Sequence, residues 1–342
     1  MAKSDAENRK IQMADIARLA GVSISTVSRA LSGSTLINEE TRQRIAELAK
    51  SLSYTVNLGA KNLRSGENRT VGVVIPYLSD HRQHVTDPFF LAMLGSLADH
   101  LTDQNFDLLF SRIDARDIQN VAALYDSGRV CGIIIIGQWS QHDSLNQLAR
   151  RQIPFVVWGG QLPQQMYCSV GSDNYNGGLL ATTHLLQLGK QRVVFMGDRD
   201  ATEAQQRYQG YVAAHAQMGK VLDPDLYLSC PFTEPEAQVA MAGFLAKGIA
   251  FDALFAASDL IAIHAMGVMR AQGLQVPQDV CVVGYDDVGM AAHSFPPLTT
   301  VSQPMDLAGE ALVSSLLTVI RQGHADSRMI TTALVERDST RI

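Results

Sequence analysis

Three polar side chains of the sequence each follow a short run of apolar residues, the place where a binding site would carry its hydrogen-bonding groups. They are Arg207, Asp259 and Asp286. Two carboxylates and a guanidinium can hold hydroxyl groups with directional, charge-assisted hydrogen bonds. These residues therefore predict a site for a hydroxylated small molecule such as a sugar. Asp259 has an alternative role, since it could cap a helix expected at 260–272.

Two tryptophans also follow apolar runs. A flat indole can cover the apolar face of a sugar ring, so Trp139 and Trp158 suggest stacking on a ligand. Packing of the two rings within the protein is the alternative interpretation.

The sequence holds no motif that would indicate catalysis or a metal site. It contains neither G-x-S-x-G, G-x-x-x-x-G-K-[ST] nor H-E-x-x-H. His81 and His84 are the closest-spaced pair of its 9 histidines, and the others stand singly. Asp286 and Asp287 are adjacent, so a strand would point them to opposite faces. We expect no enzymatic activity, no catalytic residue, no metal and no cofactor.

The elements that must position these groups alternate along the chain. From residue 70 onward, short β-branched or apolar runs are followed by longer helical patterns, which predicts parallel sheets covered on both faces. The stretch is too long for one sheet, so we expect two doubly wound α/β lobes that bind ligand beyond the carboxyl ends of their strands. The expected strands are 70–76, 106–110, 132–137, 154–158, 192–197, 253–257, 280–284 and 329–335, and the expected helices include 89–101, 115–125, 144–151, 175–188 and 260–272.

Charge divides the chain into a basic head and an acidic body. The whole sequence has 28 Lys and Arg against 34 Asp and Glu, a net charge of −6, yet residues 1–69 alone are basic. Such asymmetry suggests a partner that only the head contacts. Residues 1–10 are polar, the four cysteines are scattered, and no run reaches the roughly 18 apolar residues of a membrane span. We expect a cytoplasmic protein with reduced, buried thiols and no membrane segment.

The head carries the pattern of three short helices. The first ends at Gly21, which tolerates a positive φ, and Ser23 is placed to cap the second. Asn38 and the two glutamates after it predict the start of the third helix. Two helices joined by so short a turn form a helix-turn-helix. The apolar positions at helical spacing are Ile16, Ala17, Leu19, Ala20, Val27, Ala30, Leu31, Ile45, Leu48, Ala49 and Leu52.

The second helix presents a polar face that suits DNA. Hydroxyls can reach phosphates, and an arginine can donate two parallel hydrogen bonds to a guanine edge in the major groove. An ordinary solvated face, or one that docks a protein, is the alternative. The residues concerned are Ser23, Ser25, Thr26, Ser28 and Arg29.

The residues of the head resemble the DNA-binding domain of the lactose-repressor (LacI/GalR) family of bacterial regulators. The resemblance is carried by the stretches M-A-D-I-A, A-G-V-S and T-V-S-R between residues 13 and 29, with 38–44 behind them, and it extends to the body. It implies that Ile24, Ser25 and Arg29 read base edges. It also implies that Ser23, Thr26, Ser28 and Asn38 contact phosphates.

Residues 57–64 are similar to the hinge helix of the family. The resemblance places Leu63 as the wedge that enters the minor groove, while packing in a plain linker is the alternative. Val56 stands where the family commonly has proline, and Gly59 lowers the helix propensity of this segment. We therefore expect the hinge helix to be ordered only when the protein is bound to DNA. The hinge residues implied to contact DNA are Asn57, Ala60, Lys61 and Leu63.

In the body, the resemblance implies a cleft that binds an effector between the two lobes. It assigns Arg207, Asp259 and Asp286 to this cleft, adds Phe232 as a stacking aromatic, and places Phe89 and Phe90 at its mouth, where a role in the core is the alternative. Gly159 and Gly160 depart from the family pattern at the cleft, and 79–86 looks like an insertion there.

The sequence thus predicts a helix-turn-helix domain at 1–56, a hinge and linker at 57–69, and an effector-binding and dimerisation domain at 70–342. We expect a homodimer on palindromic operator DNA at the nucleoid, because one helix-turn-helix reads too few base pairs. The leucine-heptad tail that makes some members of this family tetrameric is absent after residue 335, which leaves the choice between a dimer and a higher oligomer open. The expected function is repression controlled by a sugar. Three alternatives remain: a ligand-binding sensor, a regulator that needs its ligand as co-repressor, and one that responds to a non-sugar molecule.

Overall fold

The computed structural model describes residues 11–31, 33–52, 54, 68–79 and 83–341. The chain divides into two compact units, residues 1–68 and 69–342. The expected hinge residues Asn57, Ala60, Lys61 and Leu63 lie outside the described residues. No helix in the described part of the chain is both long and apolar enough to cross a membrane.

The described residues of the first unit form three helices, whose ends are capped as the sequence predicts. Its helices are α1 (Met13–Ala20), α2 (Ile24–Leu31) and α3 (Glu39–Ser51). Gly21 ends α1 with a φ of 65°. The backbone N–H of Thr26 donates to Oγ of Ser23 at 3.1 Å, and the N–H of Thr41 donates to Oδ1 of Asn38 at 2.8 Å. Three local signals thus place the helix ends.

A small apolar core holds these three helices together. Each helix contributes two buried residues, which are Ile16 and Ala17, Val27 and Ala30, and Ile45 and Ala49. The spacing also predicts Leu19 in this core, but Leu19 is 58% exposed because it lies on the outer face of α1. The spacing of apolar residues alone does not reveal which face of this short helix is covered.

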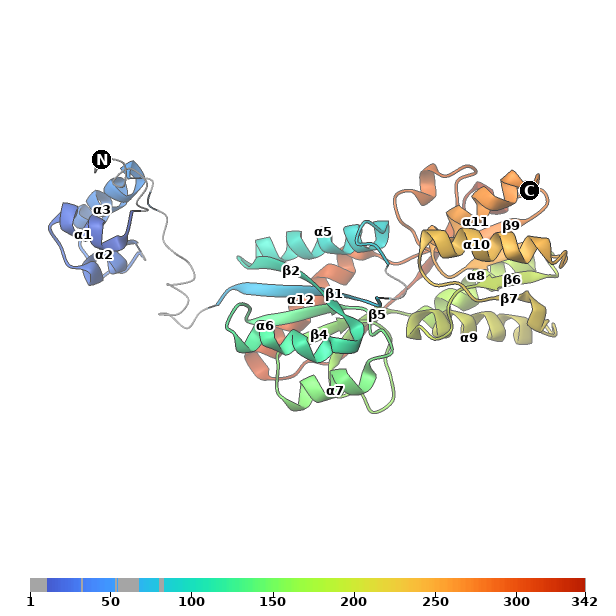
Figure 1. Ribbon diagram of the computed structural model, residues 1–342, viewed down its shortest axis with the longest axis horizontal. Helices are drawn as coiled ribbons and strands as arrows, with labels where there is room; N and C mark the ends of the chain where they lie inside the picture. Colours follow the sequence, from blue (N-terminus) through green and yellow to red (C-terminus); the bar gives the residue numbers. More distant parts are fainter. Residues whose placement is uncertain (1–10, 32, 53, 55–67, 80–82, 342) are drawn as a thin grey trace, which may run out of the picture. The chain divides into compact units, whose positions relative to one another are not determined.

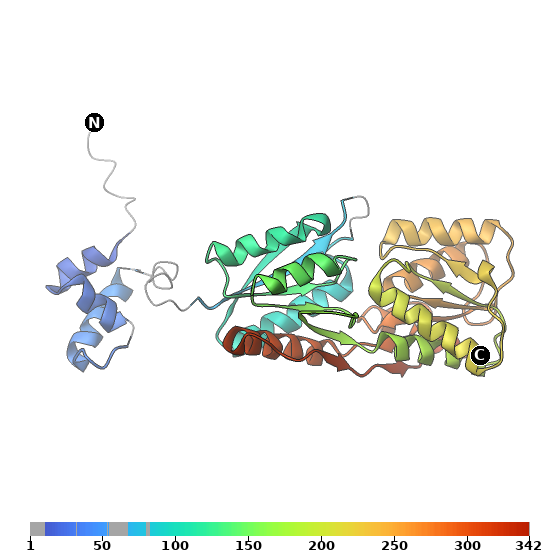
Figure 2. The ribbon, with the colours of Figure 1, turned by 90° about the horizontal axis from the view of Figure 1, so that it is seen from below.

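The second unit consists of two lobes, each built on a six-stranded sheet with helices on both faces (Figures 1 and 2). The strand order is β11-β5-β4-β3-β1-β2 in the first lobe and β12-β10-β9-β8-β6-β7 in the second. Neighbouring strands are parallel, except that β12 is antiparallel to β10. This confirms two doubly wound lobes.

The first lobe takes its core from two helical layers. Helices α5 (Pro88–Asp103) and α12 (Met305–Gln322) cover one face of the sheet, and α6 (Ala122–Asp126) and α7 (His142–Arg150) cover the other. The strands are β1 (Thr70–Tyr77), β2 (Asp107–Asp114), β3 (Gly132–Ile136), β4 (Phe155–Trp158), β5 (Cys168–Ser172) and β11 (Arg328–Ile330). A 3₁₀ segment, Ala115–Val121, precedes α6.

The second lobe has the same layers. Helices α8 (Asn174–Gln187) and α9 (Thr202–Gln217) lie on one face, and α10 (Glu234–Ala246) and α11 (Asp259–Ala271) lie on the other (Figure 1). The strands are β6 (Val193–Met196), β7 (Tyr227–Leu228), β8 (Ala253–Ala256), β9 (Cys281–Asp286), β10 (Thr299–Ser302) and β12 (Ala333–Val335). Short 3₁₀ turns lie at Pro224–Leu226, Ala291–His293 and Asp338–Thr340.

The chain passes between the lobes three times, from β5 to α8, from β10 to α12 and from β11 to β12. The last passage corrects the sequence prediction of one strand at 329–335. The structure has two short strands there, one in each sheet, because the chain leaves the first lobe after Ile330 and enters the second at Ala333. A pocket between the lobes is lined by residues at or after the carboxyl ends of strands, including residues of helices α5 and α9.

Candidate functional site

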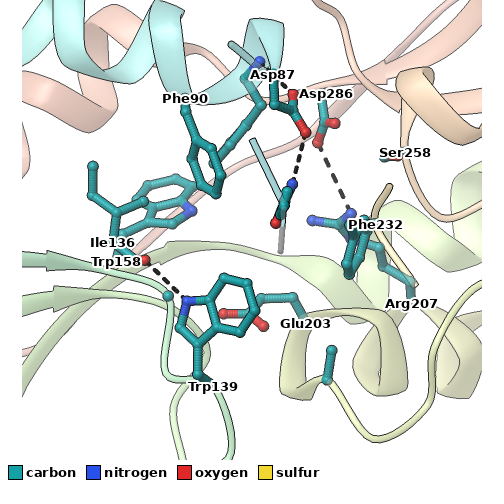
Figure 3. A pocket seen from close by; sticks show the side chains of 14 residues that line it. Asp87, Phe90, Ile136, Trp139, Trp158, Glu203, Arg207, Phe232, Ser258 and Asp286 are labelled. Atoms are coloured by element: carbon teal, nitrogen blue, oxygen red, sulfur yellow. Dashed lines mark hydrogen bonds and ion pairs between the residues drawn. The ribbon is translucent and has the colours of Figure 1, made fainter. Parts of the chain in front are cut away.

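A pocket between the lobes brings together seven of the eight residues expected to bind the effector (Figure 3). The first lobe contributes Phe89, Phe90, Trp139 and Trp158, and the second contributes Arg207, Phe232 and Asp286. The empty space inside is about 670 Å³, part of which opens to solvent. The remaining lining residues are Gln83, Asp87, Ile136, Gly137, Ala201, Glu203 and Ser258.

The aromatic residues of the first lobe form one apolar side of this pocket. Phe89 contacts Phe90 edge to face with ring centroids 5.7 Å apart, and it lies 6.3 Å from the ring of Trp158. Phe90 and Trp158 are buried, whereas Phe89 and Trp139 are half-buried. The two alternatives for these residues therefore coexist, because each ring packs in the lobe and also lines the pocket.

A turn of unusual backbone conformation carries Trp139. Gly137, Trp139 and Ser140 have φ values of 96°, 49° and 57°, and the indole nitrogen of Trp139 donates to the carbonyl of Ile136 at 3.4 Å. A Cβ at Gly137 would lie 2.5 Å from that nitrogen, so only glycine fits under the indole. Ser140 donates to the carbonyl of Asp200 in the second lobe at 2.9 Å. The turn thus fixes the indole and contacts the opposite lobe.

Arg207 is positioned by two helices that cross closely. A Cβ at Gly178 of α8 would lie 2.1 Å from the carbonyl oxygen of Arg207, and a Cβ at Gly210 of α9 would lie 2.1 Å from that of Tyr175. At this crossing, Nε of Arg207 donates to Oδ1 of Asn174 at 2.8 Å, and Nη1 donates to the carbonyl of Ala257. Because Gly178 and Gly210 have no side chain, the two helices approach closely enough for Arg207 of α9 to reach Asn174, the first residue of α8.

The guanidinium of Arg207 is buried between an acid and an aromatic ring. It lies 3.6 Å from the ring centroid of Tyr285, and Nη1 is 3.9 Å from Oδ1 of Asp286 (Figure 3). Asp286 also accepts from Nε2 of Gln303 at 2.6 Å. Burial raises the pKa of Asp286 well above its ordinary value, while Arg207 opposes that shift.

Asp286 has a φ of 120°, a backbone conformation that residues with a side chain rarely adopt. Such strain persists only where the surroundings hold the residue in place. The backbone conformation of Asp286 directs its carboxyl group, at the end of β9, into the pocket.

Asp259 lies behind the pocket and is not among its lining residues. It is fully buried, and its carboxyl accepts from Oγ1 of Thr300 at 2.6 Å and from the N–H of Val288 at 2.9 Å. The N-cap of α11 is Ser258, so Asp259 does not have the capping role considered from the sequence. Burial raises the pKa of Asp259 to about 7. In this structure Asp259 ties the loop after Asp286 to the neighbouring strand.

Sequence reasoning missed four polar residues of the pocket: Gln83, Asp87, Glu203 and Ser258. Asp87 is the N-cap of α5, where its carboxyl accepts from the N–H of Phe89 at 2.9 Å and from Nε2 of Gln83 at 2.7 Å. An aspartate directly before a proline and an apolar helix is a usable signal for such a cap. Gln83 belongs to the segment expected as an insertion, and Glu203 in the first turn of α9 carries no distinctive signal.

In the first unit, the residues expected to face DNA lie on the surface of α2 and at its start. Ser23, Ile24, Ser25 and Arg29 are exposed, with Ile24 at 46%. Thr26 and Ser28 are half-buried, and Asn38 is exposed at the start of α3. The exposed side chain of Ile24, beside a row of hydroxyls, suits contact with a thymine methyl group.

Both parts of the chain match known protein families. Residues 12–57 match the model described as bacterial regulatory proteins, lacI family, and residues 182–340 match that of a periplasmic binding protein-like domain. The fold and the pocket therefore define a regulator in which a DNA-binding head is joined to a ligand-binding body.

The relatives make the family explicit. The chain is 31% identical to the HTH-type transcriptional regulator CelR of Thermobifida fusca, over 88% of this chain and 89% of that protein. It is 30% identical to the probable HTH-type transcriptional repressor ExuR of Bacillus subtilis, over 97% and 98%. A solved complex of CelR with cellobiose matches with a TM-score of 0.71 at 30% identity, covering 96% of this chain and 99% of that one. The chain belongs to the LacI family of bacterial transcriptional regulators.

Proposed function

We propose that this protein is a repressor of transcription whose affinity for operator DNA is set by a sugar bound between its lobes. The observation that carries the proposal is the pocket, where an aromatic side from one lobe faces Arg207 and Asp286 from the other. Such a pairing suits a sugar, because the rings cover its apolar faces while the charged groups hold its hydroxyls. The solved CelR complex contains cellobiose, and a LacI-family regulator from Enterococcus faecium, 27% identical, contains ribose.

The head supplies the contacts with DNA. In this proposal Ile24 and Ser25 at the start of α2 read base edges, with Arg29 one turn further along. The hydroxyls of Ser23, Thr26 and Ser28 bind phosphates, together with Asn38. We also propose that Leu63 is the wedge of a hinge helix and that Asn57, Ala60 and Lys61 contact DNA beside it. The functional unit is a homodimer on a palindromic operator, so its place of action is the chromosome in the cytoplasm.

The three passages of the chain between the lobes allow a ligand in the pocket to control the affinity for the operator. A ligand that contacts both lobes favours one arrangement of the body, and the operator favours one arrangement of the two heads. The two affinities are then coupled, by typically 1–3 kcal/mol. Operator affinity measured with and without a saturating sugar decides whether the sugar releases the operator or strengthens its binding, and either direction is regulation.

The test is selection of a preferred duplex in vitro, followed by fluorescence anisotropy at fixed salt, because phosphate contacts make the affinity depend on salt. We expect a palindromic site, and we expect Arg29→Ala to bind it about tenfold or more weakly. Arg18→Ala is the matched control, since it removes the same charge from the exposed face of α1. The proposal fails if no sequence is preferred, or if the Arg29 and Arg18 variants weaken binding equally.

A further inference from the structure

The pocket has more negative than positive groups among its described lining residues. Asp87, Glu203 and Asp286 contribute three carboxyl groups, and Arg207 contributes a single guanidinium. That guanidinium is already engaged, since it faces Asp286 at 3.9 Å, stacks on Tyr285 and donates to Asn174. An acidic group on a ligand would therefore meet more carboxyl groups than cations in this pocket.

The two carboxyl groups that Arg207 does not contact come from opposite lobes. Asp87 begins α5 in the first lobe, and Glu203 lies in the first turn of α9 in the second (Figure 3). A ligand that fills the pocket therefore meets a carboxyl group on each side. Asp87 is also close enough to Asp286 for its charge to raise the pKa of Asp286. Burial raises the pKa of both Asp87 and Glu203, as expected of carboxyl groups that water solvates poorly.

We propose that Asp87 and Glu203 set the charge selectivity of the pocket, so that it accepts uncharged sugars through their hydroxyl donors and excludes sugar acids and sugar phosphates. The inference rests on the proposed function, because it concerns the same site and the same class of ligand. Carboxylates accept hydrogen bonds and donate none, so a hydroxyl group satisfies them and a second carboxylate does not. Poor solvation strengthens the repulsion between like charges, which makes the discrimination larger than it would be in water.

The test uses pairs of sugars that differ only in an acidic group. Glucose with glucuronate, ribose with ribose 5-phosphate, and cellobiose with the disaccharide that has glucuronate at its non-reducing end are titrated into the full-length protein by calorimetry. At pH 7.5 we expect the uncharged member of any pair that binds to bind at least about tenfold more tightly than its acidic partner.

Two variants remove the negative charges with little change of shape. Asp87→Asn keeps a good N-cap for α5, and Glu203→Gln keeps the length of the side chain. Each substitution should reduce the ratio between the dissociation constants of the acidic and the uncharged sugar of a pair at least about threefold, mainly because the acidic sugar binds better. Asp99→Asn is the matched control, since Asp99 is exposed on α5 away from the pocket. This substitution should leave the ratio of the two dissociation constants unchanged.

Three outcomes would overturn the proposal. An acidic sugar that binds as tightly as its uncharged partner contradicts it directly. An unchanged ratio of the dissociation constants in both pocket variants shows that other groups set the selectivity, while the sugar-controlled function stands. If no sugar of any pair binds, although the protein binds its selected operator, the proposal of a sugar effector fails and this inference fails with it.

Discussion

Replacing Arg207 by methionine should expose how strongly the buried pair in the pocket is coupled. The substitution keeps an unbranched side chain against Tyr285 but removes the charge that faces Asp286 at 3.9 Å. At an effective dielectric constant of about 20, two unit charges at this distance attract each other by about 4 kcal/mol. This agrees with the roughly 3–5 kcal/mol lost when one partner of a buried pair is removed.

The cost of this substitution should depend on pH. Burial already raises the pKa of Asp286, and loss of Arg207 removes an influence that lowers it, so the pKa rises further. A carboxyl group with a higher pKa in the folded state binds its proton more tightly there. Its contribution to stability is therefore present at low pH and is lost as pH rises from the unfolded value of about 3.9 through the folded value. Arg207→Met should thus destabilise the protein less at pH 5 than at pH 8.

The assay is a double-mutant cycle of Arg207→Met, Asp286→Asn and the double variant, with urea unfolding followed by circular dichroism at both pH values. The amide introduced by Asp286→Asn can still accept from Gln303, so the single acid variant keeps that contact. We expect a coupling energy of up to about 4 kcal/mol at pH 8, where more of Asp286 is ionised, and a smaller one at pH 5. Additive effects within about 0.5 kcal/mol at both pH values would refute the coupling.

Three further substitutions test other parts of the structure. Gly210→Ala would place a Cβ 2.1 Å from the carbonyl oxygen of Tyr175, so we expect a loss of about 1–3 kcal/mol of unfolding free energy, whereas Gly243→Ala, which meets open space on α10, should be neutral or stabilising. Asp259 contributes to a fall of the melting temperature as the pH rises, so the melting temperature of Asp259→Asn should fall less than that of the unchanged protein. The folded pKa of about 7 means that the stability contributed by Asp259 is lost between about pH 4 and 7, and an unchanged pH profile would contradict this. Asn38→Ala removes the N-cap of α3 and should cost the head about 1 kcal/mol in thermal unfolding, while an unchanged melting temperature would show that the cap is not needed.

Local signals predict much of the fold. Ser23 and Asn38 cap the helices that their types and positions indicate, and Gly21 ends α1 as expected. The apolar strands of the body are also recognisable, because a strand covered on both faces is a continuous apolar run. Helix α9 is harder to recognise, since Tyr211 is the one large hydrophobic residue on its buried face, beside Ala204, Arg207, Gly210, Ala214 and His215.

The site is predicted less completely because it depends on contacts between distant residues. Asp259 and Asp286 follow neighbouring strands in the same way, yet only Asp286 lines the pocket, because Thr300 on a third strand holds the carboxyl of Asp259. Asp87 and Glu203 reach the pocket from different lobes, so no spacing along the chain relates them. Seven of the eight expected residues do converge, since the segments that follow parallel strands, among them the starts of α5 and α9, lie at the same edge of each sheet.

The central claim is that the pocket and the operator are coupled, and reciprocity tests it most directly. Operator affinity is measured by anisotropy with and without a saturating sugar, and sugar affinity is measured by calorimetry with and without the operator duplex. The account predicts that both affinities change by the same factor, about 5- to 150-fold, because coupling between two sites on one molecule is mutual. A sugar that binds the protein while leaving the operator affinity unchanged would contradict it.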